Sequence, residues 1–200
     1  MKKIGIFLAV CANVFNINAQ NKINGHEYVD LGLSVKWATC NVGANKPEEY
    51  GNYYAWGETT TKSSYTEDNC LTCGANISDI SGNAIYDAAR ANWGDSWRMP
   101  TIAEMEELKN KCTWGWTSQS GVNGYKVTGP NGNSIFLPAA GIQLDSDSPH
   151  GVGKGGCYWS STSDDDSRAI YAQRIMFGSR KLNVDKFLRK YGEPVRPVTE

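Results

Sequence analysis

The sequence predicts an α+β fold, and three observations support that class. Apolar residues alternate with polar ones in "LGLSVKW" (31–37), a period of two that is typical of a half-buried strand. Two helix signals follow in the middle of the chain, and a run of strand-like segments fills the rest. Strands, then helices, then further strands indicate α+β rather than an alternating parallel architecture.

The clearest helix signal begins with Thr101 and Glu104, which form a capping box. Beyond them, apolar residues recur every three or four positions as far as Cys112, so that they form one stripe of a helix. A shorter helix is expected over "AARANW" (88–93), with Asp87 as its N-cap. The sequence therefore predicts two helices.

The segment after these helices is expected to be antiparallel β structure. "GYKVTGPNGNSIFLP" (124–138) indicates two strands joined by a turn, and "GGCYWSST" (155–162) indicates a third. Two further strands are expected over 169–177 and 181–189, and the proline-containing end (193–200) is expected to form a short edge strand.

Residues 45–79 show little periodicity and are rich in Gly, Asn, Thr, Ser and Tyr. We expect long ordered loops there, with one short strand. Loops of this length are uncommon in compact domains and often carry function.

The first nineteen residues have the pattern of a secretory signal peptide. Lys2 and Lys3 form a basic start, a short apolar run follows, and Ala19 supplies a small residue at a cleavage point. Lipidation at Cys11 is the alternative interpretation. Residues 20–200 are then expected to form one exported domain, secreted, periplasmic or on the outer cell surface. No later segment is long and apolar enough to span a bilayer.

The charge of the exported chain argues against nucleic acid as a partner. Removal of residues 1–19 leaves 18 basic and 21 acidic residues, a net charge of −3, and there is no basic tract. Binding to nucleic acid depends on neutralisation of phosphates by such tracts.

Five cysteines remain after residue 19, which in an exported chain indicates disulfides. Cys70 and Cys73 have the spacing of a disulfide, of an inert thiol pair or of a metal or redox site. A zinc site would need a second pair of ligands, and the two histidines of the sequence are isolated from one another. We therefore favour a structural disulfide and predict no metal site and no cofactor.

A second disulfide is expected between Cys40 and Cys112. Cys40 follows the alternating stretch, and Cys112 ends the apolar stripe of the main helix, where strand and helix should pack. The alternative is two small buried thiols that fill core space. Cys157 is the next partner to examine if the pairing fails.

Several residues are candidates for contact with a ligand. Trp114 and Trp116 alternate with small residues just past the main helix, and Asp145 and Asp147 alternate in a loop. The three aspartates between two strand-like segments are expected to lie in an exposed loop rather than in a catalytic cluster, because successive side chains rarely converge on one atom. These are Asp164, Asp165 and Asp166.

Six blocks in order resemble the Fibrobacter succinogenes major paralogous domain, a family of exported bacterial proteins. The blocks are "YVDLGLSVKWATCNVGA", "YGNYYAWGE", "ANWGDSWRMPTIAEMEEL", "GYKVTGPNGNSIFLPAAG", "YWSST" and "VRPV". They run from about Glu27 to Val198, nearly the whole exported chain. The chain departs from the family near its end, where Gly192, Glu193 and Pro194 replace a Gly-Arg-Ser run.

The resemblance implies a C-type lectin-like fold, with two helices, small antiparallel sheets and long ordered loops. It carries no catalytic residues to this chain, and the calcium-binding tripeptides of sugar-binding lectins do not occur here. We therefore expect a noncatalytic binding module for a surface glycan or protein. The alternative is a structural component of a surface layer or appendage. An oxidase like the formylglycine-generating enzymes is disfavoured, because the loop of Cys70 and Cys73 lacks their context.

Overall fold

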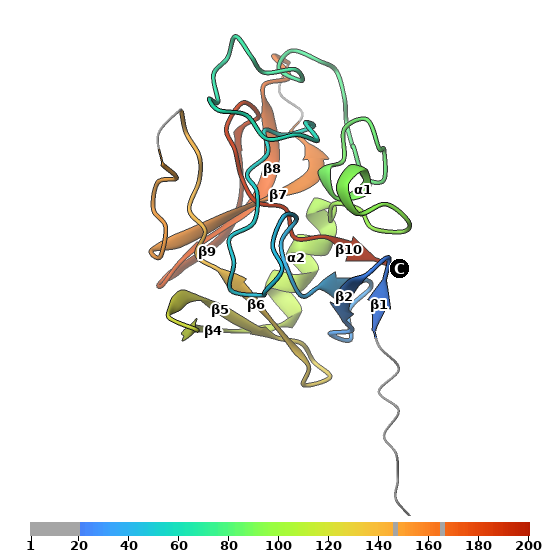
Figure 1. The fold of residues 1–200 in the computed structure, drawn as a ribbon, viewed down its shortest axis with the longest axis vertical. Coiled ribbons are helices and arrows are strands. Elements are labelled where there is room, and N and C mark those ends of the chain that lie inside the picture. Colours follow the sequence, from blue (N-terminus) through green and yellow to red (C-terminus); the bar gives the residue numbers. More distant parts are fainter. Residues whose placement is uncertain (1–20, 146–147, 165–166) are drawn as a thin grey trace, which may run out of the picture.

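The computed structural model describes residues 21–145, 148–164 and 167–200, so the expected signal segment lies outside the described residues. Within these ranges the chain is mostly β structure, with two short helices and three small antiparallel sheets (Figure 1). No helix of this part is long and apolar enough to cross a membrane.

The first sheet brings the two ends of the described chain together. Its strands lie in the order β1-β2-β3-β10, with the bounds Lys22–Ile23, His26–Val29, Lys36–Ala38 and Val198–Thr199. Val198 of β10 pairs with Trp37 of β3. The closing segment is therefore the last strand of this order, as expected, but its other side is not an open edge, because Val198 exchanges backbone hydrogen bonds with Arg98 at 2.9 and 3.1 Å.

The alternating stretch 31–37 differs from its expectation, because only its end belongs to β3. The side chain of Asp30 accepts a hydrogen bond from the backbone N–H of Gly32 at 2.7 Å. Gly32 has a φ of 73°, and together these features bend the chain before β3. Leu31, Val35 and Trp37 are nevertheless buried, so the predicted apolar side is correct.

The other two sheets are meanders of three strands each. One contains β4 (Thr113–Gln119), β5 (Val122–Thr128) and β6 (Ser134–Pro138). The other contains β7 (Gly155–Ser163), β8 (Tyr171–Gly178) and β9 (Lys181–Leu188). The strands predicted for this half are confirmed, and β4 is an additional strand that the residue pattern does not single out.

Both predicted helices are present with the predicted caps. In α1 (Ala88–Trp93) the side chain of Asp87 accepts from two backbone N–H groups of the first turn. In α2 (Ile102–Lys111) Thr101 and Glu104 form the reciprocal capping box. α2 packs against β7, β8 and β9.

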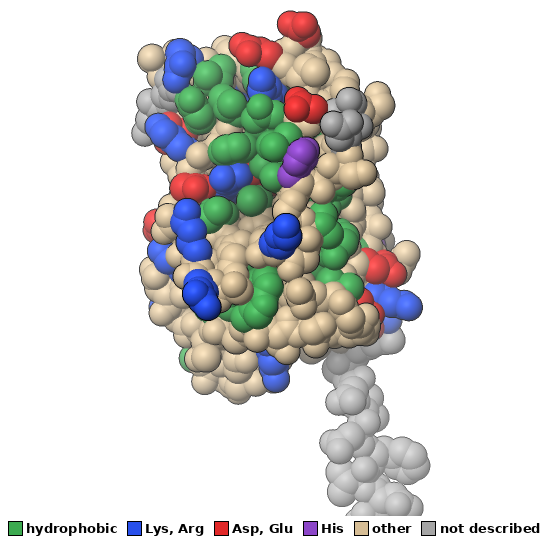
Figure 2. Space-filling view, turned by 90° about the vertical axis from the view of Figure 1, so that its left-hand side faces the viewer, with side chains coloured by type: hydrophobic (Ala, Val, Ile, Leu, Met, Phe, Trp, Pro, Cys, Tyr) green, Lys and Arg blue, Asp and Glu red, His purple; other side chains and the backbone are tan. Residues whose placement is uncertain are grey.

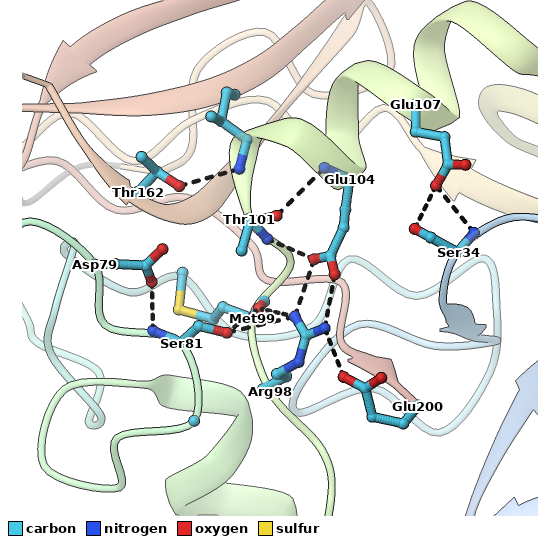
Figure 3. A network of polar contacts seen from close by, with 12 residues as sticks. Ser34, Asp79, Ser81, Arg98, Met99, Thr101, Glu104, Glu107, Thr162 and Glu200 are labelled. Carbon is cyan, nitrogen blue, oxygen red and sulfur yellow. Dashed lines mark hydrogen bonds and ion pairs between the residues drawn. The ribbon is translucent and has the colours of Figure 1, made fainter.

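A network of charges fixes the start of α2 (Figure 3). The guanidinium of Arg98 binds both carboxylate oxygens of Glu104, at 2.6 and 2.9 Å, and one oxygen of Glu200 at 3.0 Å. One turn along the helix, Glu107 accepts hydrogen bonds from the backbone and the hydroxyl of Ser34. The helix is thus joined to the segment before β3, and through Arg98 to the last residue of the chain.

The hydrophobic interior has two clusters. The first lies between α2, the β4–β6 sheet and the β7–β9 sheet, and it includes Trp37. The second lies beneath α1 and the long loops and includes Trp56, Trp97 and Trp159. These four indoles are at most 1% exposed, so they belong to the core.

Buried Arg189 attaches the long loop to this second cluster. Its guanidinium donates to the carbonyl oxygens of Thr72 and Ala75, at 3.0 and 2.9 Å, and stacks over the ring of Trp56 at 4.3 Å. The loop therefore has a fixed path over the core although it contains no helix and almost no strand pairing.

The outer surface is mixed in character on the face that Figure 2 shows. Hydrophobic side chains lie there in several groups, with lysines and arginines between them. A ligand that met this face would therefore contact polar and apolar side chains together.

Candidate functional site

A groove of about 440 Å³ lies over the face of the β4–β6 sheet that points away from the core. We call it the sheet groove. Its lining residues are Thr39, Pro47, Thr117, Ser118, Gln119, Lys126, Ser134, Ile135 and Phe136. The volume is within the range of small-ligand sites, roughly 300 to 1,000 Å³.

Strand alternation explains why polar side chains reach the groove. On β5, Tyr125 and Val127 belong to the first core cluster, so Lys126 between them points to the opposite face. On β6, Ile135 and Leu137 also belong to that cluster, which places Phe136 on the groove side. The sheet therefore separates an apolar inner face from a mixed outer face.

An aromatic ring forms the floor of the groove. Phe136 is 5% exposed, and its ring lies over Gly124 of the neighbouring strand. A Cβ atom at Gly124 would come within 2.7 Å of the Cζ atom of this ring. Only glycine leaves room for the ring in this position, so the shape of the floor depends on that residue.

Buried Arg196 connects the floor to one wall. Its guanidinium donates to the carbonyl oxygen of Phe136 at 3.0 Å and to that of Thr39 at 2.8 Å. It also donates to the carbonyl oxygen of Ala38 at 3.0 Å and to the side-chain oxygen of Asn41 at 2.8 Å. The groove is therefore framed by a buried group that four hydrogen bonds hold in place.

The loop of residues 42–52 forms the second wall and is closed at its base. The backbone N–H of Asn52 donates to the carbonyl of Val42 at 2.9 Å, and the side chain of Asn41 donates to the carbonyl of Tyr50 at 2.8 Å. A Cβ atom at Gly51 would lie 2.5 Å from the carbonyl oxygen of Val42, so this closure requires glycine.

The tip of this loop reaches the end of β4. The side chain of Gln119 donates to the Glu48 carboxylate at 3.2 Å. The pKa of the Glu48 carboxyl is lowered, mainly by a hydrogen bond from the main chain of Glu48 and secondarily by one from the side chain of Ser120. One end of the groove is therefore anionic at neutral pH, and the ammonium of Lys126 adds a cation to its lining.

These side chains suit a polar ligand that is rich in donors and acceptors. Hydroxyl groups of Thr117 and Ser134, one amide and one ammonium surround the aromatic floor. Sugars and extended peptides both present alternating polar groups and apolar surfaces. Among the described residues, no cluster of three or more His, Cys, Asp or Glu side chains is arranged to hold a metal ion.

A pocket of about 330 Å³ beside Tyr53 and Tyr65 is less suitable for a ligand. The Tyr53 hydroxyl donates to the carbonyl of Ala140, and the Tyr65 hydroxyl donates to the carbonyl of Tyr53, each at 2.6 Å. The donor protons of both hydroxyls are therefore already used within the protein.

No protein-family model, curated protein or solved structure matches this chain.

Trp114 and Trp116 are half-buried on the inner face of β4. The ring of Trp116 meets Tyr125 edge-on at 5.2 Å, and the indole N–H of Trp114 donates to the carbonyl of Leu108 at 3.2 Å. Both pack against the first core cluster. The side chains of β4 that point to the groove side are instead those of Thr117 and Gln119.

The selected aspartates do not come together in the described structure. Asp145 is exposed, whereas Asp164 is only 15% exposed in its side chain and forms an ion pair with Lys186 at 2.7 Å. Asp164 does follow the end of β7 in a loop, as expected, but its expected exposure is wrong, because this ion pair and a hydrogen bond from Gln173 hold its side chain against the sheet. Asp147, Asp165 and Asp166 lie outside the described residues.

The expected disulfide between Cys70 and Cys73 is present, with the Cα atoms 5.5 Å apart. The expected pairing of Cys40 with Cys112 is wrong, since both are free thiols, as is Cys157. α2 packs on β7–β9, and Cys112 at its end joins the first core cluster. Cys40 lies beyond β3 and lines a separate surface pocket of about 250 Å³ with His26 and Trp93.

A buried ion pair lies beneath the β7–β9 sheet. Arg174 binds Glu193 at 2.6 Å and Asp185 at 2.8 Å. Burial raises the pKa of Glu193 to about 7 against the attraction of Arg174, and its second carboxylate oxygen has no hydrogen-bond partner among the described residues. Glu193 has no exposed surface, so the pair fixes the closing segment rather than meeting a ligand.

Sequence reasoning missed the residues that build the groove. The period of two in β5 and β6 places Lys126, Ser134 and Phe136 on the outer face, so a local signal existed for these three. No local signal indicates that Arg196 frames the groove, because its partners lie as far as 158 positions away.

Proposed function

We propose that this chain is an exported, noncatalytic binding module that holds a glycan or an extended protein segment in the sheet groove. It would act at the cell surface or outside the cell. The observation that carries the proposal is the rigid frame that Arg196 builds between Thr39 and Phe136. A groove that is already formed loses little conformational entropy when a ligand binds.

Export and the fold family belong to the same proposal. The basic and apolar start of the chain supports export, and six blocks in family order support membership of the major paralogous domain family. Long loops that are fixed over small antiparallel sheets are compatible with a C-type lectin-like scaffold. A fold does not determine which ligand is bound, so the specificity must come from the side chains that line the groove.

The test is binding of the purified protein to broad glycan and peptide arrays, followed by titration of each hit against groove variants. Lys126→Glu reverses the groove cation, and Ser134→Trp fills the cavity. We expect either change to weaken binding by at least about tenfold, which corresponds to roughly 1.4 kcal/mol. Lys181→Glu is the matched charge control, because Lys181 is exposed at the start of β9 and does not line the groove.

Two results would contradict the proposal. If the protein is located at the cell surface but binds no glycan and no peptide on either array, a binding role for the groove is excluded. Hits that bind Lys126→Glu and Ser134→Trp as well as the wild type would place the ligand elsewhere on the molecule.

A second candidate function is a structural component of a surface layer or appendage. The uncovered edge of β4 favours it, since sheet edges support assembly through main-chain hydrogen bonds. Recovery of the protein as a stoichiometric part of an envelope complex would support this function. Recovery only as a free chain would exclude it.

A further inference from the structure

β4 is the outer strand of the β4–β6 sheet and has a long edge without the usual protection. Its seven residues, "TWGWTSQ", include no proline and no charged side chain. Its pairing with β5 is continuous from Thr113 to Gln119, without a bulge. Native edges are normally blocked by lysine, proline, bulges or short length, and β4 has none of these.

The turn after β4 decides which backbone groups face outward. Ser120 and Gly121 have φ values of 50° and 83°, as in a two-residue turn of type I′. The pair Gln119 and Val122 that flanks such a turn exchanges hydrogen bonds. Hydrogen-bonded residues alternate along an antiparallel pair, so the N–H and C=O groups of Trp114, Trp116 and Ser118 point away from β5.

No other part of the described chain covers these groups. The backbone hydrogen bonds outside the regular helices and strands include none from Trp114, Trp116 or Ser118. β4 lies at the lower border of the fold in Figure 1, with β5 as its neighbour in the sheet. Three residues thus offer donors and acceptors in the geometry of a strand that lacks a partner.

We propose that a second copy of this chain pairs with this edge, β4 against β4, in an antiparallel dimer with its twofold axis at Trp116. In this register Trp116 faces its own counterpart, and Trp114 faces Ser118 of the other copy. It is the register that uses all three outward residues of both chains, with about six main-chain hydrogen bonds. The absence of charge on β4 means that no like charges meet across the axis.

Charges at the two ends of β4 favour a second copy over an unrelated peptide. Lys111 precedes the strand; its side chain is 62% exposed, and its ammonium also contacts Glu107 of its own helix at 2.9 Å. Glu48 lies at the opposite end, where Gln119 holds it. An antiparallel twofold arrangement places the Lys111 end of one chain beside the Glu48 end of the other, and it does so twice.

The dimer would join the two β4–β6 sheets into one continuous sheet of six strands. A twofold axis perpendicular to the sheet keeps the outer faces of both copies on the same side. Both sheet grooves would then open in one direction, so that a ligand with repeated units could engage both. The proposal itself depends on the edge of β4 and not on any ligand of the groove.

The first test is the molar mass of the purified protein by sedimentation and light scattering, over a wide range of concentration. We expect a dimer for the wild type and for Ser118→Ala, and a monomer for Ser118→Pro. Proline at 118 removes an outward N–H and no bond to β5, whereas alanine retains that N–H. Circular dichroism establishes that the proline variant is folded.

The second test fixes the register and does not depend on the proline variant. Gly115 and Thr117 of opposite copies would form a non-hydrogen-bonded pair with Cα atoms about 4.5 Å apart, close enough for a disulfide. A Cβ atom at Gly115 has open space, with its nearest neighbour 3.9 Å away. We expect the double variant Gly115→Cys and Thr117→Cys to form a 115–117 intermolecular crosslink, located by mass spectrometry, and neither single variant to form it.

A wild type that remains monomeric would overturn the proposal, as would a dimer that persists in folded Ser118→Pro. Failure of the double-cysteine variant to crosslink would exclude the register. Lys126→Glu distinguishes this proposal from the groove proposal, because Lys126 lies on the central strand and the variant should remain dimeric even where it loses its ligand.

Discussion

The guanidinium of Arg196 donates from Nε to the side-chain oxygen of Asn41 at 2.8 Å, although the two residues are 155 positions apart in the chain. Arg196 is 1% exposed, and the oxygens that it binds belong to an amide and three backbone carbonyls. Burial lowers the pKa of Arg196 from its ordinary value. The charged group is tolerated in the interior because its N–H groups bind these four oxygens, an arrangement that requires the planar guanidinium.

We expect Arg196→Met to lower the free energy of unfolding by about 3 kcal/mol or more, because it leaves several buried acceptors without donors. Arg196→Lys keeps the charge but loses the planar guanidinium, so its free energy of unfolding should lie between those of the wild type and Arg196→Met. Chemical denaturation measures these differences. Arg180→Met is the control, since Arg180 is exposed at the turn between β8 and β9 and should change stability by less than about 0.5 kcal/mol. Equal stability of the Arg196 and Arg180 variants would contradict this account.

The buried Glu193 should make the stability depend on pH. Burial raises its pKa to about 7, whereas an unfolded glutamate releases its proton near about 4.3. Between these values the native state keeps a proton that the unfolded state has lost, so stability falls as the pH rises through this window. The slope should approach 1.4 kcal/mol per pH unit at most.

Glu193→Gln is the matched variant for this prediction, because the amide oxygen can still accept from Arg174 and cannot titrate. The free energy of unfolding of the wild type, relative to that of the variant, should rise as the pH falls from 7 to 5. Denaturant titrations at several pH values measure the difference. Parallel curves for the two proteins would show that Glu193 does not titrate in this window.

The sequence predicts those parts of the fold that local signals specify. The capping box of Thr101 and Glu104, the N-cap at Asp87 and the hairpin turns are each decided within a few residues. The groove arises differently. Gln119 and Glu48 are 71 positions apart, and no local sequence pattern predicts their contact.

The error over Cys40 and Cys112 has the same origin. Sequence reasoning placed the main helix against the alternating strand because both carry apolar faces. In the structure α2 shares the first core cluster with Leu31, Val35 and Trp37, but Cys40 lies beyond β3 and lines a separate surface pocket. Apolar patterns therefore show which faces are buried together, but they do not show which individual side chains meet.

The Cys70–Cys73 disulfide should stabilise the protein through the residue it encloses. Thr72 is 1% exposed, its hydroxyl donates to the carbonyl of Trp56, and its own carbonyl accepts from Arg189. Replacement of both cysteines by serine should lower the free energy of unfolding by about 2 kcal/mol, the value for closure of so short a loop. Hydrogen exchange should become faster around Thr72.

Leu71→Ala is the control for this loop, since Leu71 lies between the same two cysteines and is 79% exposed. It should leave both the stability and the exchange rates nearly unchanged. Serine variants that are as stable as the wild type would show that the hydrogen bonds of Thr72 do not need the disulfide.

The three free thiols of the described residues, Cys40, Cys112 and Cys157, should differ in reactivity toward iodoacetamide. Burial, and secondarily the Glu107 carboxylate, raise the pKa of Cys112 to about 11; burial, and secondarily Glu193, raise that of Cys157 to about 12. The thiolate is the reactive form, so both should resist alkylation at pH 8. Cys40 lines a surface pocket and should be labelled first.

Mass mapping of the native protein should show one modified cysteine among these three, and all three should be modified after denaturation without reductant. A Cys40–Cys112 bridge, or native labelling at Cys157, would contradict this assignment.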